Sequence, residues 1–260
     1  MINRSTPDGT MRSVRTALRV LEAVAELQPV GLSELSRKLE LPKATVQRGL
    51  STLASAGWLE NDPAEPARWI VSTRAFIVGA TVGDRGGLRP QALPFMNALA
   101  AEVQETIHLM IPDGNTVVLI ERLDSPHPVR AFSPLGARAP LHASSNGKAI
   151  LAHRPDEEIS RYLATELSPV TPHTIVQPDM LRRELDLIRE RGYAVADEEL
   201  QDGVVSVAAA IRPGNRSPVG SLSISGPKSR MPQALRADYG KKVRTAADNI
   251  AAALPAASPT

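Results

Sequence analysis

The chain has 260 residues, of which 42% are hydrophobic, so its length allows one or two domains and the larger can bury a real core. It contains no cysteine, which excludes disulfides and thiolate metal sites, and no apolar run approaches the roughly 20 residues of a membrane span; we therefore expect a cytoplasmic protein without a membrane partner. Lys and Arg (30) nearly balance Asp and Glu (28), so bulk charge alone does not indicate a nucleic-acid partner.

The N-terminal segment 1–11 is polar, and we expect it to be a disordered tail. A helix is expected directly after it. Its apolar residues recur at helical spacing: Val14, Leu18, Leu21 and Val24. We expect these side chains to form the face that covers the two helices that follow.

Residues 31–59 carry the pattern of a helix-turn-helix. Two short amphipathic helices are joined at Leu41 and Pro42, and Ser33 stands where an N-cap of the first would be. The apolar stripes are Leu32, Leu35 and Leu39 in the first helix and Val46, Leu50 and Leu53 in the second. The second helix would therefore bury one side and turn a polar side to solvent.

That polar side is a candidate surface for DNA. It consists of Lys43, Ala44, Thr45, Gln47 and Arg48, near the end of the helix that would enter the major groove. No acidic residue between positions 43 and 57 repels phosphate. We expect base-specific contacts from Gln47 or Arg48 and phosphate contacts from Lys43 and Thr45.

Residues 57–71 predict a two-stranded wing, with a turn at Asn61 to Pro63 and an apolar return strand at 68–71. A plain helical hairpin with a solvated outer face is the alternative for the two short helices alone. Three helices and a wing can bury a small core, which a hairpin cannot. We therefore expect a DNA-binding domain over residues 12–72, with further phosphate contacts from Arg15 and Arg68.

Residues 73–89 predict a linker helix that ends at glycines and a proline. Beyond it, helices alternate with hairpin-linked strands, a mixture typical of an antiparallel α+β sensor-like domain, which we expect over 90–254. The helices are expected at 93–103, 147–153, 180–191 and 236–254, and the strands at 106–111, 117–123, 204–211 and 219–225. The end, 255–260, is expected to be disordered.

The segment 140–149 is the best candidate for binding a small molecule. Ser144 or Ser145 can cap the helix that follows, Gly147 permits close approach of the backbone, and the first amides of a helix can receive a carboxylate. The segment lacks the first glycine of a phosphate loop. A capped helix without a ligand, with Lys148 in solvent, is the alternative.

The strand at 219–225 alternates strictly, which places Ser221, Ser223 and Ser225 on one face. In the preceding strand Ser206 shares a face with two small alanines. Small and polar residues fit a pocket wall, and they equally fit a helix packed tightly on that face.

Catalysis has little support in the sequence. The five histidines are scattered, and neither H-E-x-x-H nor G-x-S-x-G occurs. A hydrolase relay of Ser144, His142 and Asp197 can be written down, but no spacing supports it. We expect no enzyme, no metal site and no cofactor.

Two runs, SVRTALRVLE at 13–22 and LPKATVQR at 41–48, resemble the winged helix of IclR-family transcriptional regulators. The second domain is similar to that of the same family over several segments in the family's order. They are residues 105–109, 140–149, 191–195, 197–199 and 223–227. The resemblance extends from about Arg12 to Leu254.

The resemblance implies a transcriptional regulator, more specifically a repressor of a catabolic operon, with an effector-binding domain of GAF-like fold. It implies a homodimer formed through the winged helices, or a dimer of dimers (homotetramer). Its partner would be double-stranded DNA with a pseudo-palindromic operator, because the symmetry of the protein is mirrored in the DNA. A small organic acid or aromatic compound would be the effector.

The effector positions implied by the resemblance, together with the candidates above, are Ser144, Ser145, Asn146, Gly147, Ser206, Ser223, Ala196 and Asp197. Ser145 and Asn146 fall where the family's loop offers backbone amides to the ligand. Ser206 and Ala196 depart from members that have a cysteine and an aspartate there, so a two-carbon or three-carbon acid is not transferred as the ligand. Asp197, next to Ala196, need not point inward.

A protein of another class remains as the rival hypothesis. It is a small-molecule-binding protein or enzyme whose winged helix contacts another protein instead of DNA. This alternative predicts no salt-dependent binding to duplex DNA and tolerates removal of charge at Lys43 and Arg48.

Overall fold

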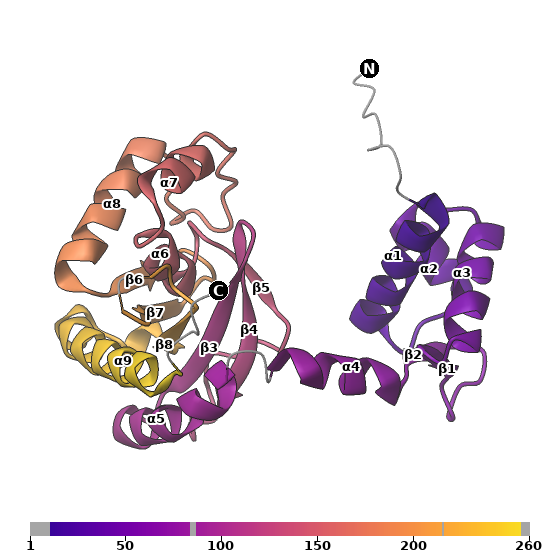
Figure 1. Cartoon of the computed structure of the whole chain (residues 1–260), viewed down its shortest axis with the longest axis horizontal. Coiled ribbons are helices and arrows are strands. Elements are labelled where there is room, and N and C mark those ends of the chain that lie inside the picture. The colour runs from indigo at the N-terminus through magenta and orange to yellow at the C-terminus, as the bar shows by residue number, and fades with distance from the viewer. Residues whose placement is uncertain (1–10, 84–86, 215, 256–260) are drawn as a thin grey trace. The chain divides into compact units, whose positions relative to one another are not determined.

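The structure is a computed structural model that describes residues 11–83, 87–214 and 216–255 (Figure 1). The two tails expected to be disordered fall outside the described residues, except for Met11 and Pro255. Within the described ranges, no helix is both long enough and apolar enough to cross a membrane.

The chain divides into two compact units, residues 1–82 and 83–260. The elements of the first unit are α1 (Arg12–Leu27), α2 (Leu32–Leu39), α3 (Lys43–Ser55), β1 (Leu59–Asn61), β2 (Trp69–Val71) and α4 (Thr73–Gly83). β1 and β2 pair antiparallel, with Leu59 opposite Val71. The helix-turn-helix and the two-stranded wing expected from the sequence are therefore confirmed.

The core of the first unit lies where α1, α2 and α3 meet. Leu35, Val46 and Leu50 are fully buried there, as their spacing predicts. Gly49 allows α1 to come close to α3, because a Cβ at this position would lie 3.2 Å from Cγ2 of Val20. This packing fixes which side of α3 remains free.

The predicted N-cap of α2 was wrong. Ser33 lies inside the helix, and the capping position belongs to Gly31. The carboxylate of Glu34 accepts a hydrogen bond of 2.9 Å from the N–H of Gly31 and so stabilises the earlier start.

The predicted buried face of α1 was wrong in its first half. Val14 and Leu18 are each 50% exposed, whereas Val20 and Val24 are buried. The side of α1 that packs on α3 is therefore rotated from the predicted stripe, and two large apolar side chains remain at the surface.

The second unit is built on a six-stranded antiparallel sheet with strand order β5-β4-β3-β8-β7-β6. Its strands are β3 (Thr106–Asp113), β4 (Thr116–Leu123), β5 (Arg138–Pro140), β6 (Ala194–Asp197), β7 (Val204–Ile211) and β8 (Gly220–Pro227). Its helices are α5 (Leu88–Val103), α6 (Ser145–Leu151), α7 (Asp156–Leu163), α8 (Pro178–Arg191), α9 (Gln233–Ala253) and the short 3-10 helix Lys228–Arg230. The predicted combination of a winged helix-turn-helix and a mixed α/β domain is confirmed.

Helices cover both faces of this sheet, with α5 and α9 on one side and α6 to α8 on the other (Figure 1). Strict alternation in β8 sends Leu222 and Ile224 into the core shared with α5 and α9. The serines of β8 therefore face α6, which packs on β7 and β8. The tightly packed helix considered as an alternative for that face is present, and it leaves only one end of the face open.

Four elements of this unit were not predicted: α7, β5, β6 and the 3-10 helix Lys228–Arg230. In addition, α5 begins at Leu88, before Pro90. Proline is tolerated in the first turn of a helix because the N–H that it lacks has no partner there. The predicted linker 73–89 thus comprises α4 and the start of α5.

Candidate functional site

The outward side of α3 is formed by the residues that the sequence indicated. Lys43, Ala44, Gln47 and Arg48 are exposed, and Thr45 is half-buried. Lys43 and Arg48 form no ion pair with any residue that the structure describes. Their charges are therefore available for phosphate or for base edges.

The two arginines expected outside α3 differ in their surroundings. Arg15 is exposed on α1. Arg68 is already engaged: its Nε donates to the carbonyl of Pro29 at 2.9 Å and its Nη2 to Glu34 at 3.1 Å. The Gly31 N–H and the nearby Arg68 guanidinium lower the pKa of Glu34. Arg68 thus connects the wing to α2, and a phosphate would have to compete with these bonds.

The second unit contains a cavity of about 90 Å³ at the N-terminal end of α6. Its polar lining consists of His108, Ser133, Arg138, Ser144, Asn146, Gln201, Ser206 and Ser225. Its apolar lining consists of Met110, Leu119, Phe132, Leu200, Val204 and the alanines 131, 137, 139 and 196. A cavity with a largely apolar wall and a few polar groups is suited to a small organic molecule.

Four expected effector residues line this cavity: Ser144, Asn146, Ala196 and Ser206. Ser144 also caps α6, as predicted, because its Oγ accepts a hydrogen bond of 3.0 Å from the N–H of Gly147. The cap fixes the direction in which the first turn of α6 faces the cavity.

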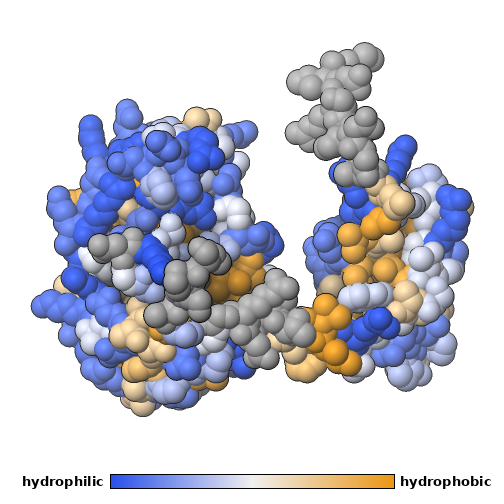
Figure 2. Space-filling view, viewed as in Figure 1, coloured by the Kyte–Doolittle hydropathy of each residue, from blue (hydrophilic) through white to orange (hydrophobic). Residues whose placement is uncertain are grey.

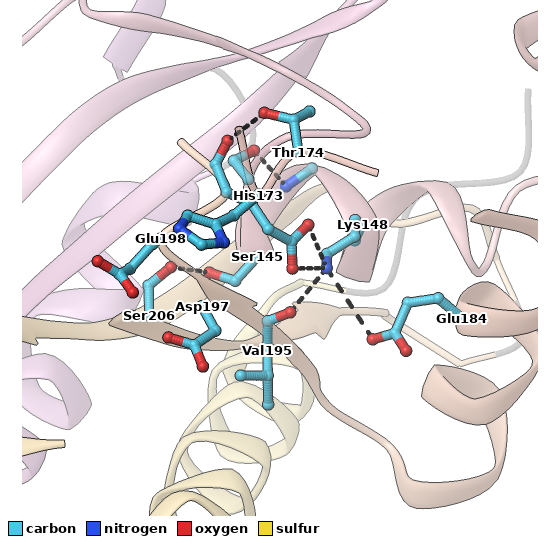
Figure 3. A network of polar contacts seen from close by, with 12 residues as sticks. Ser145, Lys148, His173, Thr174, Glu184, Val195, Asp197, Glu198 and Ser206 are labelled. Atoms are coloured by element: carbon cyan, nitrogen blue, oxygen red, sulfur yellow. Dashed lines mark hydrogen bonds and ion pairs between the residues drawn. The ribbon is translucent and has the colours of Figure 1, made fainter. Parts of the chain in front are cut away.

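The other four expected residues do not line the cavity. Ser145 lies behind its wall, where its Oγ donates to Oγ of Ser206 at 2.8 Å (Figure 3). Gly147 is packed so closely that a Cβ would lie 2.5 Å from the backbone of Leu141. Ser223 is fully buried within β8. These three residues position the wall without touching the empty space.

Asp197 is the fourth, and it points away from the cavity. Its carboxylate accepts a hydrogen bond of 2.9 Å from Arg236 on α9 and forms an ion pair of 3.3 Å with Lys228. The possible hydrolase relay is not assembled either, because the ring of His142 bonds to Tyr162 (2.8 Å) and to the carbonyl of Ser168 (3.0 Å).

Lys148 is not in solvent, contrary to the alternative considered from the sequence. It is 0% exposed, and its Nζ donates to both carboxylate oxygens of Glu199, at 2.6 and 2.8 Å. The same ammonium donates to the carbonyl of Val195 at 2.7 Å, and Glu184 lies 4.0 Å away (Figure 3). Because α6 packs on β6, β7 and β8, the lysine stem is buried and its end meets these acceptors.

The Lys148–Glu199 pair links α6 to another part of the cavity wall. Burial raises the pKa of Glu199, and the adjacent ammonium offsets part of that rise. The backbone carbonyl of Glu199 also accepts a hydrogen bond of 2.7 Å from Thr174. Leu200 and Gln201, which follow directly, line the cavity. The pair therefore holds two sides of the cavity in a fixed relation.

His108 is a cavity residue that the sequence reasoning missed. It lies on β3 and is 8% exposed; its Nδ1 is 3.4 Å from Oγ of Ser225. Its Nε2 has no hydrogen-bond partner among the described residues. Burial, aided by the charge of Arg122, lowers its pKa from 6.5 to about 4, so the ring is neutral at pH 7. The sequence signal for it is the alternation along β3, which places His108 and Met110 on the same face of the sheet, and both residues line the cavity.

These features define the class of the protein. A winged helix-turn-helix with exposed, unpaired basic residues on α3 and a separate domain with a cavity for a small molecule occur together in ligand-responsive transcriptional regulators. Residues 80–252 match the family model "Bacterial transcriptional regulator IclR C-terminal", and residues 13–63 match "IclR helix-turn-helix domain". The chain belongs to the IclR family of transcriptional regulators, which are not enzymes.

Individual relatives agree. The transcriptional repressor AllR of Escherichia coli (strain K12) is 38% identical over 224 residues, which cover 86% of this chain and 82% of AllR. The transcriptional repressor IclR of the same strain is 32% identical over 246 residues, 93% of this chain and 89% of IclR. A crystal structure of an IclR homolog from Microbacterium hydrocarbonoxydans complexed with 4-hydroxybenzoate superposes with a TM-score of 0.81 at 27% identity, covering 93% of this chain and 98% of that chain.

Replacing Lys148 by Met should lower the free energy of unfolding by about 3–5 kcal/mol, because it leaves the Glu199 carboxylate buried without its partner. The double variant Lys148→Met/Glu199→Leu should recover most of this loss, because no charge then remains buried. Urea unfolding of the full chain measures both. Lys242→Met, which removes pairs with the exposed Glu102 and Asp238, is the control and should cost about 1 kcal/mol or less. If Lys148→Met were as stable as the control, the Lys148–Glu199 pair would not contribute the predicted free energy of unfolding.

The unfolding free energy should also depend on pH through His108. The unfolded chain binds a proton at this residue below pH 6.5 and the folded chain only near pH 4, so the stability contributed above pH 6.5 is lost as the pH falls through this window. The difference corresponds to about 3 kcal/mol. His108→Leu should remove this part of the pH dependence, and parallel curves for the two proteins between pH 7 and pH 4 would contradict the assignment.

Proposed function

We propose that this regulator is a repressor of a catabolic operon, that it binds its operator as a homodimer through α3, and that a small organic acid or aromatic compound in the cavity changes this binding. The observation that carries the proposal is the side of α3 with Lys43, Gln47 and Arg48. It is exposed, basic and free of carboxylates, and the helix is fixed from behind by Val46 and Leu50. A side of this kind fits the major groove of DNA.

Within α3 the residues have different tasks. Gln47 can present a donor and an acceptor to a base edge and Arg48 can present two donors, so we assign sequence readout to them. Lys43 and Thr45 stand at the first turn and contact phosphate, which positions the helix. Ala44 has no polar group and permits close approach. Arg15 adds a phosphate contact from α1.

Large exposed apolar side chains support the homodimer. They are Met11, which precedes α1, Val14 and Leu18 on α1, and, on α4, Ile77 and Phe76, which is 79% exposed. Figure 2 shows apolar surface, in orange, over these two helices of the first unit. Such surface is typical of protein contacts. Two copies related by a two-fold axis require a pseudo-palindromic operator.

The cavity supports the effector. Ala196 stands where some members have an aspartate and Ser206 where some have a cysteine, so the side chains on this part of the wall are smaller and less charged. Phe132, Met110 and Leu119 form an apolar side of the cavity. The similar structure complexed with 4-hydroxybenzoate supports an aromatic acid as one ligand class. The effector can change operator affinity only by its difference in affinity for two arrangements of the protein.

Fluorescence anisotropy with DNA from upstream of the gene, against a scrambled duplex and across a salt series, tests this function. We expect preferential binding of the upstream DNA. Arg48→Ala should cost about 1–3 kcal/mol on that DNA and little on the scrambled duplex. Lys43→Ala should weaken both alike and reduce the salt slope by about one unit.

Lys241→Ala is the matched control, because Lys241 is an exposed lysine on α9 of the second unit and should leave DNA binding unchanged. Equal losses for Arg48→Ala on both duplexes would remove Arg48 from the residues that read sequence. Weak binding to both duplexes, insensitive to salt and to both α3 variants, would favour the rival in which the winged helix contacts a protein.

A further inference from the structure

We propose that His108 binds the effector directly, and that its Nε2–H donates a hydrogen bond to a carboxylate or carbonyl oxygen of a ligand whose remaining part is apolar. This inference rests on the proposed function, because it takes the cavity as the effector site. It adds a ligand-binding residue that lies outside both the serine-rich loop and the start of α6, and it names the atom that donates to the ligand.

The first observation is a buried polar atom without a partner. His108 is more than nine-tenths buried on the central strand β3 and lines the cavity, yet its Nε2 bonds to no described residue. A buried nitrogen of this kind costs free energy unless it is satisfied. The atom itself has almost no accessible surface, so a ligand in the cavity can supply the missing partner when the imidazole ring turns toward the space that His108 lines.

The second step is our assignment of the ring proton to Nε2, the tautomer in which Nδ1 accepts from Ser225. The ring is neutral, so it has one N–H. Nδ1 lies 3.4 Å from Oγ of Ser225, a hydroxyl that can donate to it. With Nδ1 as the acceptor, the proton is on Nε2, and the group offered to a ligand is a donor. The matching ligand atom is an oxygen acceptor.

The charges around the cavity agree with an acceptor. Its lining contains no Asp, Glu or Lys, and its only charged member among the described residues is Arg138. The nearest carboxylates on the β6 side are committed elsewhere, Asp197 to Arg236 and Glu199 to Lys148. A cationic ligand would therefore find no carboxylate in this lining, whereas a carboxylate would meet hydrogen-bond donors and the guanidinium of Arg138, which also pairs with Asp113.

The remainder of the lining selects the body of the ligand. Met110, Leu119 and Phe132 are apolar, and Phe132 is held in place by Arg122, whose guanidinium lies 4.1 Å from the ring centre. An apolar or aromatic group packs on this side by the hydrophobic effect. The ligand class is thus a monocarboxylate or ketone with an apolar body.

Nitrogen NMR of the histidine rings in the full chain tests the donor. His108→Leu assigns the signals, and the ligand-free protein should show a neutral His108 with its proton on Nε2. Benzoate is the probe, and benzamidine, of the same shape but cationic, is its matched control. We expect benzoate to shift the Nε2 signal of His108 and benzamidine to leave it unchanged. A proton on Nδ1, or no shift with benzoate, would overturn the proposal.

Affinity for benzoate, measured by calorimetry, tests the contribution of the bond. His108→Leu should weaken benzoate binding roughly tenfold or more. It should not lower the melting temperature at pH 7, because it removes an unsatisfied polar atom. His108→Gln retains a donor and should keep part of the affinity. His153→Gln, at a histidine that does not line the cavity, should bind benzoate as the wild type does.

Unchanged benzoate affinity in His108→Leu would overturn the proposal, and so would an equal loss in His153→Gln. Operator binding separates this result from the proposed function. If the wild type itself fails to bind that DNA, the proposed function fails while the histidine assignment is still decided by the benzoate data.

Discussion

An ammonium group with no exposure to solvent has to be matched by charge and by hydrogen bonds, and Lys148 finds both in Glu199 and in the carbonyl of Val195. This requirement joins α6 to the end of β6 and to the segment that follows it. The first turn of α6 presents Ser144 and Asn146 to the cavity, and the segment after Glu199 presents Leu200 and Gln201. The shape of the cavity therefore depends on an ion pair that lies outside it. Neither Lys148 nor Glu199 lines the cavity, but the pair holds the residues that do.

The first unit follows a different principle. The helices of this unit are short. One side of α3 is packed through Val46, Leu50 and the close approach at Gly49, so the other side of α3 does not take part in the core. Arg68 joins the wing to α2 through Glu34 and Pro29. One unit thus presents a rigid basic surface and the other encloses a small space, which is the division of labour expected in a family of ligand-responsive regulators.

Local patterns were sufficient where the contact partners lie close in sequence. Helical spacing predicted the buried side of α3, alternation predicted the two faces of β8, and Ser144 was one of the two residues expected to cap α6. Lys148 could not be placed, because its partner Glu199 is 51 residues away and only the packing of α6 on the sheet brings them together. His108 could be assigned to a strand, but the cavity beside it is formed by Phe132 and by residues of β4, β6, β7, β8 and the start of α6, which are far apart in the sequence. Val14 and Leu18 were assigned to the core since an exposed apolar stripe has the same spacing as a buried one.

In the proposed regulator, occupation of the cavity and binding of the operator are coupled. Coupling is reciprocal, so operator DNA must change the affinity of the protein for a cavity ligand by the same factor by which that ligand changes operator affinity. The measurement is calorimetric titration of benzoate into the full chain, free and saturated with upstream duplex. We expect two different dissociation constants, whose ratio equals the change in operator affinity that benzoate causes. A benzoate affinity that is identical with and without the duplex would contradict this coupling.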